Sequence, residues 1–434
     1  MRNTYSKEEQ SWMMYDWGHS AYSIVISTAV FPLFYKAAAE GAGVSSTDST
    51  AYLGYAVAIS TFILAMLGPI LGTIADYQGF KKSFFAFFSL LGVCATALLT
   101  FIPGDNWQLL LVGYMLIAIG SAGSNVFYDA FLVDVTDDSR MNKVSARGFA
   151  TGYIGSTIPF LISIAVLLLA QQEVLPVSVT AASRIAFFTT AVWWGIFTLP
   201  MLRNVRQTHY IQREPRMVAN SFRSLLETMK QIRQHRAIFL FLLAYFFYID
   251  GVGTIITMST AYGTDLGIGS TDLLIILFVT QVVAAPFAIL YGRLADRFSG
   301  KTMLYAGICV YIIVCIYAYF MKSAFDFWVL AMLVATSQGG IQALSRAYFA
   351  RLVPKENANR FFGFYNIFDK FASILGPLLV GLTAQLTGNT SAGVFSLVIL
   401  FIAGLAILLQ VPEPEGAPKP GRIGASAGES GILN

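Results

Sequence analysis

Long apolar runs, separated by short polar segments, follow one another along most of the chain. Each run has at least about 18 residues, the length that an α-helix needs to cross a hydrocarbon layer of about 30 Å. The runs do not alternate as the strands of a membrane barrel do. The pattern therefore predicts an all-α membrane protein with twelve transmembrane helices. The predicted spans are residues 12–36, 50–75, 83–102, 107–133, 146–170, 182–202, 237–262, 271–292, 302–321, 325–350, 360–386 and 391–411.

Composition and charge agree with this pattern. Hydrophobic residues make up 56% of the chain and charged residues 12%, whereas soluble domains carry about 25% charged residues. Basic residues concentrate in alternate loops, and the positive-inside rule then places both termini in the cytoplasm. The net charge of +4 thus reflects membrane orientation, and no nucleic-acid partner is expected. The first span lacks a small-residue cleavage site, so we expect a retained helix rather than a signal peptide.

A short polar motif occurs twice, in residues 72–82 and again in residues 292–301. Each copy has a glycine, an aspartate four residues later and then basic residues, and each lies between two consecutive spans on the predicted cytoplasmic side. The repeat indicates two related halves, and helical membrane proteins built in this way are mostly transporters. We expect the glycines to allow close helix approach, and the aspartates to cap a helix or pair with a basic side chain. The predicted gating residues of this motif are Gly72, Asp76, Gly79, Lys81, Lys82, Gly292, Asp296 and Arg297.

A second repeat relates the end of span 4 to the end of span 10, in residues 123–134 and 340–351. Asp129 and Asp134 of the first half match Arg346 and Arg351 of the second. These four residues could form salt bridges across the cytoplasmic mouth and act as a gate. The alternative is that each charge pairs within its own half.

The spans divide the chain into two bundles. We predict an N-terminal six-helix bundle over residues 1–202, a cytoplasmic linker over 203–236 and a C-terminal six-helix bundle over 237–411. Apolar residues recur at helical spacing from position 221 onward, which predicts a basic amphipathic helix in the linker. That helix is either a tether between the bundles or a regulatory element. Residues 412–434 are rich in Gly, Pro, Ala and Ser, and we expect a disordered tail.

Charged residues inside the spans are candidate functional residues, because placing a charge at the centre of a membrane costs about 2.5–3.5 kcal/mol on insertion scales. Asp250 in span 7 and Asp369 with Lys370 in span 11 are predicted to lie near the midplane. Asp250 could pair permanently with Lys370, or protonation and substrate binding could release the pair and drive a conformational change. Gly251 and Gly253 would allow the backbone to unwind beside Asp250 or to approach a ligand.

Span 1 contains Asp16, His19 and Tyr22. Asp16 is shallower than Asp250, so it is predicted to be a gate or a helix cap. His19 could titrate near neutral pH, or it could be a hydrogen-bonded structural histidine. Tyr22 follows on about the same helix face.

The sequence contains no motif for ATP hydrolysis. Residues 299–302 approach a phosphate-binding loop, but Ala295 replaces the required glycine and the segment lies between apolar helices. We also find no spacing typical of a metal site, a dinucleotide site or a catalytic triad, so we expect no cofactor, no metal and no enzymatic activity. The remaining energy source for transport is a gradient of protons or of a solute, as in secondary transporters.

The repeated motif at residues 72–82 and 292–301 resembles the loop signature of the major facilitator superfamily. Further stretches, at residues 15–22, 144–155, 244–252, 339–348, 361–365 and 370–377, resemble the vacuole-effluxer-like branch, which includes the autophagy-related amino-acid exporter of fungal vacuoles. The resemblance implies a twelve-helix carrier that works by alternating access, with spans 1, 4, 7 and 10 around a central cavity. Polar residues of spans 4 and 10 then join the candidate substrate site. They are Asn125, Tyr128, Gln342 and Ser345.

The function predicted from this resemblance is proton-coupled efflux of a small polar solute such as an amino acid. The alternative is a lipid or lysolipid flippase on the same scaffold. The expected partners are the small-molecule substrate, the lipid bilayer and protons, and the expected state is a monomer in a bacterial inner membrane.

Overall fold

The computed structural model describes residues 5–213, 220, 223, 235–265, 268–372 and 374–413. Almost all of these residues are helical, and twelve helices are long and apolar enough to cross a membrane, which confirms the predicted fold class. The predicted linker helix and most of the predicted tail lie outside the described residues.

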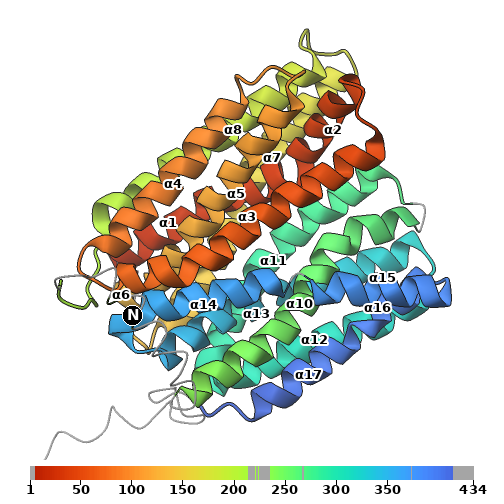
Figure 1. Cartoon of the computed structure of the whole chain (residues 1–434). Helices are drawn as coiled ribbons and strands as arrows, with labels where there is room; N and C mark the ends of the chain where they lie inside the picture. The colour runs from red at the N-terminus through yellow and green to blue at the C-terminus, as the bar shows by residue number, and fades with distance from the viewer. Residues whose placement is uncertain are drawn as a thin grey trace, which may run out of the picture.

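The helices form two bundles (Figure 1). The N-terminal bundle comprises α1 (Lys7–Ala21), the π-helix η1 (Tyr22–Val30), α2 (Phe31–Gly41), α3 (Ser46–Ala75), α4 (Phe80–Leu99), α5 (Trp107–Ala130), α6 (Leu132–Val135), α7 (Met141–Gln171) and α8 (Val179–Asn204). The C-terminal bundle comprises α10 (Arg236–Asp265), α11 (Ser270–Phe298), α12 (Gly300–Phe320), α13 (Ala324–Leu352), η2 (Lys355–Asn357), α14 (Ala358–Phe371), α15 (Leu375–Thr387), α16 (Thr390–Ser396) and α17 (Val398–Leu409).

Local sequence explains where several helices begin. Ser6 and Ser323 form capping boxes with the third residue of α1 and of α13, and Ser45 and Ser178 cap α3 and α8. These side chains satisfy amide groups that have no partner inside the helix. Many large apolar side chains remain exposed on the outer faces of both bundles, as expected for a surface that contacts lipid.

Two spans are not single α-helices. The first passes from α1 through the π-helix η1 into α2, and the eleventh is divided into α14 and α15. The predicted unwinding at Gly251 and Gly253 is wrong, because α10 runs unbroken from Arg236 to Asp265. Gly251 instead packs against the ring of Phe401, where a Cβ atom would lie 2.5 Å from the ring.

The two bundles meet at one end and diverge at the other (Figure 1). We call the meeting end the basic end; it carries the α3–α4 turn and the α11–α12 turn. There α3 packs against α14, and α7 packs against α11. Glycines permit both contacts: a Cβ atom on Gly72 would lie 2.5 Å from the carbonyl oxygen of Asn359, and one on Gly292 would lie 2.5 Å from the Cβ of Ala146.

Residues 205–213, which we call the strap, follow α8 and lie across the α3–α4 turn. The amide of Ile211 donates to the carbonyl of Asp76 at 2.8 Å, and the amide of Gln78 donates to the carbonyl of Ile211 at 3.0 Å. Lys82 donates to the carbonyl of Val205 at 2.9 Å. The start of the linker is therefore attached to the N-terminal bundle.

Candidate functional site

A polar chamber of about 370 Å³ lies between the bundles. It is lined by side chains of both halves, including nine that the sequence predicts: Asp16, His19, Asn125, Tyr128, Asp129, Gln342, Arg346, Asp369 and Lys370. Its wall also contains polar residues that the sequence analysis missed: Tyr153, Tyr245, Gln281, Gln338 and Asn366.

A second cavity of about 510 Å³ continues from the chamber toward the diverging end of the bundles. The two cavities share the lining residues Ser23, Gln281 and Gln338, so they adjoin each other. The lining of the outer cavity is largely apolar and includes Leu273 and Phe327. Among the described residues, the chamber therefore adjoins a further cavity on the side of the diverging end.

The side chains of span 1 face this chamber only in part. Asp16 lies on its wall and accepts a hydrogen bond from Ser20 at 3.1 Å, so the predicted role as a helix cap is wrong; Ser6 caps α1. His19 hydrogen-bonds Ser121 at 2.8 Å and stacks on the ring of Tyr15, as expected for a structural histidine, although it also lines the chamber. Tyr22 is buried against Trp194.

On the opposite wall, Asp369 and Lys370 form an ion pair at 3.6 Å. Asp369 also accepts a hydrogen bond from the hydroxyl of Tyr245 at 2.8 Å. Both charged side chains are about one-third exposed, 33% for Asp369 and 39% for Lys370, so they are open to the chamber rather than sealed in the bundle.

The predicted pair between Asp250 and Lys370 does not form. Asp250 is buried, and its carboxylate accepts the amide of Gly376 at 3.0 Å on each oxygen. Thr254 donates to the same carboxylate at 3.3 Å. The physical reason is the division of span 11: the first turn of α15 has unsatisfied amides, and a carboxylate at a helix N-terminus satisfies them. Asp250 thus faces α15 and not the chamber.

Ser345 is also outside the chamber. It is fully buried, and its hydroxyl lies 2.6 Å from that of Tyr248 and from the carbonyl of Ile341. The sequence placed Ser345 correctly on span 10, but its helix face points into the C-terminal bundle.

Arg346 lines the chamber and links the two bundles. Its guanidinium donates to Asp129 of the other bundle at 3.0 Å and to the hydroxyl of Ser145 at 3.0 Å. Aromatic rings surround the cation, with Phe149 at 4.5 Å and Trp12 at 4.6 Å from the guanidinium carbon to the ring centroids. The prediction that Asp129 and Arg346 pair across the bundles is confirmed.

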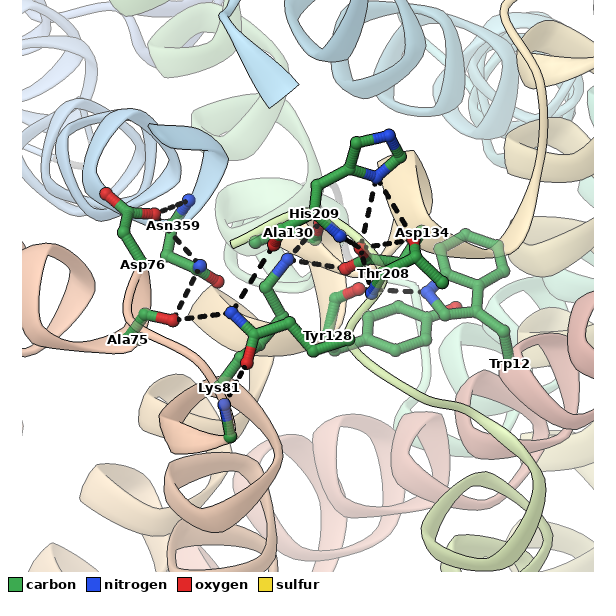
Figure 2. A network of polar contacts seen from close by, with 12 residues as sticks. Trp12, Ala75, Asp76, Lys81, Tyr128, Ala130, Asp134, Thr208, His209 and Asn359 are labelled. Atoms are coloured by element: carbon green, nitrogen blue, oxygen red, sulfur yellow. Dashed lines mark hydrogen bonds and ion pairs between the residues drawn. The ribbon is translucent and has the colours of Figure 1, made fainter. Parts of the chain in front are cut away.

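Asp134 pairs within its own half, so the predicted cross-bundle pairing of this residue is wrong. Its side chain is buried against Lys81, at 2.5 Å, and accepts hydrogen bonds from Thr208 and His209 of the strap (Figure 2). Burial alone would raise the pKa of Asp134, but Lys81 and the strap outweigh it and lower the pKa to about 2. Lys81 and Asp134 thus hold the strap in place.

Arg351 contacts the other bundle, but through a main-chain carbonyl rather than through the predicted salt bridge. It donates to the main-chain carbonyl of Asp138 at 3.1 Å, and the Asp138 carboxylate pairs with Lys355 at 3.2 Å. Both contacts join the loop before α7 to the C-terminal half at the basic end.

The repeated loop aspartates form two equivalent contacts between the bundles. Asp76 accepts the main-chain amide and the side-chain amide of Asn359, both at 3.0 Å, at the N-terminus of α14 (Figure 2). Arg360 lies 3.7 Å from the same carboxylate. Burial raises the pKa of Asp76 to about 7, against the opposing effect of Arg360 and Asn359. The expectation that this carboxylate caps a neighbouring helix is confirmed.

In the other half, Asp296 pairs with Lys143 at 3.2 Å and receives a longer contact of 3.5 Å from the side-chain amide of Asn142. We call the Asp76 and Asp296 contacts the two latches. Arg297 packs over the ring of Phe298 and takes no part in the second latch. Gly79 has a left-handed backbone with φ of +86°, and its amide donates to Gln207 of the strap at 2.9 Å.

Comparison with known proteins gives a consistent result. A family model described as "Vacuole effluxer Atg22 like" matches residues 4–419. The chain is 70% identical over 413 residues to the MFS-type transporter YxiO of Bacillus subtilis (strain 168), which covers 95% of this chain and 96% of that protein. It is 26% identical over 397 residues to autophagy-related protein 22 of Kluyveromyces lactis, covering 83% and 79% of the two chains.

Solved transporters of the major facilitator superfamily share the fold. The human organic anion transporter MFSD10 superimposes with a TM-score of 0.69 at 13% identity, covering 93% of this chain and 99% of that one. The proton:xylose symporter XylE gives 0.69 at 14% identity over 94% and 96%. FucP in the outward conformation gives 0.68 at 14% identity over 93% and 98%.

Proposed function

Because the chain belongs to the vacuole effluxer Atg22-like family and has the fold of the major facilitator superfamily, we propose that it exports a small polar solute by alternating access. Amino acids are the proposed substrates, and the proton gradient is the proposed energy source. At the level of the family the protein is a multi-pass membrane transporter. Its substrate, direction and coupling are our proposal.

The observation that carries this proposal is the polar chamber between the bundles. Its volume of about 370 Å³ suits a small solute, since ligand sites of about 300–1,000 Å³ hold small molecules. Carboxylates, cations and neutral amides line the same space, so both ends of a zwitterion can find a partner of opposite charge.

The latches support an alternating-access cycle. By the positive-inside rule the basic end is cytoplasmic. The bundles meet at that end (Figure 1) and the adjoining cavity lies on the other side of the chamber, so we interpret the described conformation as outward-facing. Opening toward the cytoplasm requires the latches and the Asp129–Arg346 pair to break while the bundles rock about the chamber. We place the protein as a monomer in a bacterial inner membrane.

A flippase remains the second candidate, because the outer cavity is lined mainly by apolar side chains such as Leu273 and Phe327. A lipid tail would be compatible with that lining, whereas the inner chamber is too polar for it. The charged chamber therefore favours the solute transporter.

The test is transport by the purified protein in proteoliposomes. We expect accumulation of radiolabelled amino acids from a panel when a pH gradient is imposed, and only slow equilibration without one. Protein-free liposomes and a variant with the gate removed, Arg346→Ala, are the controls. Transfer of a fluorescent lysolipid between leaflets, with no amino-acid transport, would instead establish the flippase.

A further inference from the structure

Asp16 and Tyr128 are neighbours on the chamber wall, and neither Asp16 Oδ2 nor Tyr128 Oη makes a hydrogen bond of good geometry with the residues that the structure describes. Both residues line the chamber, and they are only 9% and 2% exposed. A buried polar group without a partner costs about 1–3 kcal/mol, and more when it is charged. Two such atoms beside each other on a cavity wall form a place where a ligand with N–H donors would supply the missing contacts.

The charges of the chamber also point to a ligand at Asp16. Asp129 is paired with Arg346 at 3.0 Å, and Asp369 is paired with Lys370 at 3.6 Å. Asp16 has no ion pair within the described part of the chain, so the described lining holds one more carboxylate than cations. A buried charge is stable only when it is paired or hydrogen-bonded, and a positively charged ligand would complete the balance.

The surroundings of Asp16 determine which of its oxygens is available. Ser20 donates to Oδ1 at 3.1 Å, and the backbone of Gly152 packs on the same side, where a Cβ atom would lie 3.1 Å from Oδ1. One oxygen is thus held by the protein and the other, Oδ2, is left for a ligand. An ammonium group has three N–H donors, and both a carboxylate and a phenolic oxygen accept from it.

We propose that Asp16 and Tyr128 bind a protonated amine of the transported solute, and that this amine, rather than a carboxylate, is the group that the chamber requires. This inference rests on the proposed transport of small solutes and narrows their class to primary amines. Decarboxylated amines should bind, and carboxylic acids of the same skeleton without an amine should not.

The experiment measures binding to the purified full-length protein by isothermal titration calorimetry. The probes are three matched sets built on the leucine, phenylalanine and lysine skeletons: the amino acid, the amine that lacks its carboxylate, and the acid that lacks its α-amine. For the lysine skeleton the acid also lacks the side-chain amine. In at least one set we expect the two amine-bearing probes to bind at least tenfold more tightly than the acid.

The variant Asp16→Asn is expected to lose this tenfold preference. Asp105→Asn, which changes an exposed carboxylate in the loop before α5, is the matched control and should keep it. The absence of this tenfold preference from all three sets, or an Asp16→Asn variant that folds and keeps the preference, would overturn the proposal. The wild-type series tests the requirement for an amine even if Asp16→Asn does not fold.

Transport assays with the same probes separate this inference from the proposed function. A transported acid without an amine would leave solute transport intact and overturn the role of Asp16. Amine binding without any transport would instead contradict the proposed function.

Discussion

The carboxylate of Asp250 accepts hydrogen bonds at the start of α15, and this geometry assigns it a structural task. A helix that starts in the middle of a membrane has amide groups that neither lipid nor water can satisfy. A carboxylate there also interacts favourably with the positive end of the helix dipole. Asp250 therefore stabilises the division of span 11.

Replacing Asp250 by alanine should lower the free energy of unfolding by about 0.5–2 kcal/mol, the usual cost of losing a helix cap. Asp250→Asn keeps an acceptor oxygen and should cost less. Because the side chain faces α15 and not the chamber, we expect Asp250→Asn to keep gradient-driven accumulation. Thermal unfolding and proteoliposome uptake check both points, with Thr254→Val as the control. If a folded Asp250→Asn protein lost accumulation, Asp250 would have to be considered a proton carrier again.

At this scale the sequence predicts every charged member of the described chamber lining, but only some of its neutral polar and aromatic members. Asp16, Asp369 and Lys370 are conspicuous because charge is rare in a span. Gln281 and Gln338 carry a weaker signal. Position along a helix estimates the depth of a residue but not the direction in which it faces, and this is why Asp250 and Ser345 were assigned to a cavity that they do not line.

At the scale of elements, the repeat in the sequence corresponds to a repeat in helix packing. The pair Asn142 and Lys143 begins α7, and the pair Asn359 and Arg360 begins α14; each pair contacts the loop aspartate of the other half. The loop motif itself was predictable from its two copies. Its partners were not, because an Asn followed by a basic residue is too short a pattern to stand out.

Glycine at position 72 is required by the close contact of α3 with α14. We expect Gly72→Ala to force these helices apart at the basic end, because the new Cβ would lie 2.5 Å from a backbone oxygen that cannot rotate away. Transport should fall severalfold, with the basic end more open. Gly54→Ala is the matched control on the same helix, since no atom lies within 4 Å of its Cβ position. Equal activity of the two variants would contradict the proposed role of the contact.

At the scale of the whole molecule, the closed basic end should respond to pH through Asp76. The pKa of this residue is raised to about 7 while the latch is closed, and it should return toward the ordinary value of about 3.9 when water reaches the open turn. The closed form therefore binds more protons between about pH 4 and pH 7. Linkage then requires acid to favour the closed form, by up to about tenfold per pH unit.

Distances between spin labels at Ser83 and Glu356, exposed positions of the two bundles near the basic end, report this equilibrium. We expect the short-distance population to grow as the pH falls from 7.5 to 5.5. The variant Asp76→Asn should remove most of the dependence. A population that does not change with pH in the unaltered protein would exclude Asp76 as the sensor.

The two latches are equivalent in position but unequal in burial. Asp76 is fully buried and binds the main chain of α14, whereas the side chains of Asp296 and Lys143 are 20% and 41% exposed. Exposed ion pairs contribute only about 0–1 kcal/mol, so the α7–α11 side should separate first and the α3–α14 side, with its buried latch, should follow. The distance between labels at Ser139 and Phe298 would then increase before the distance between labels at Gln78 and Glu356. The two sides of the basic end would open one after the other rather than together.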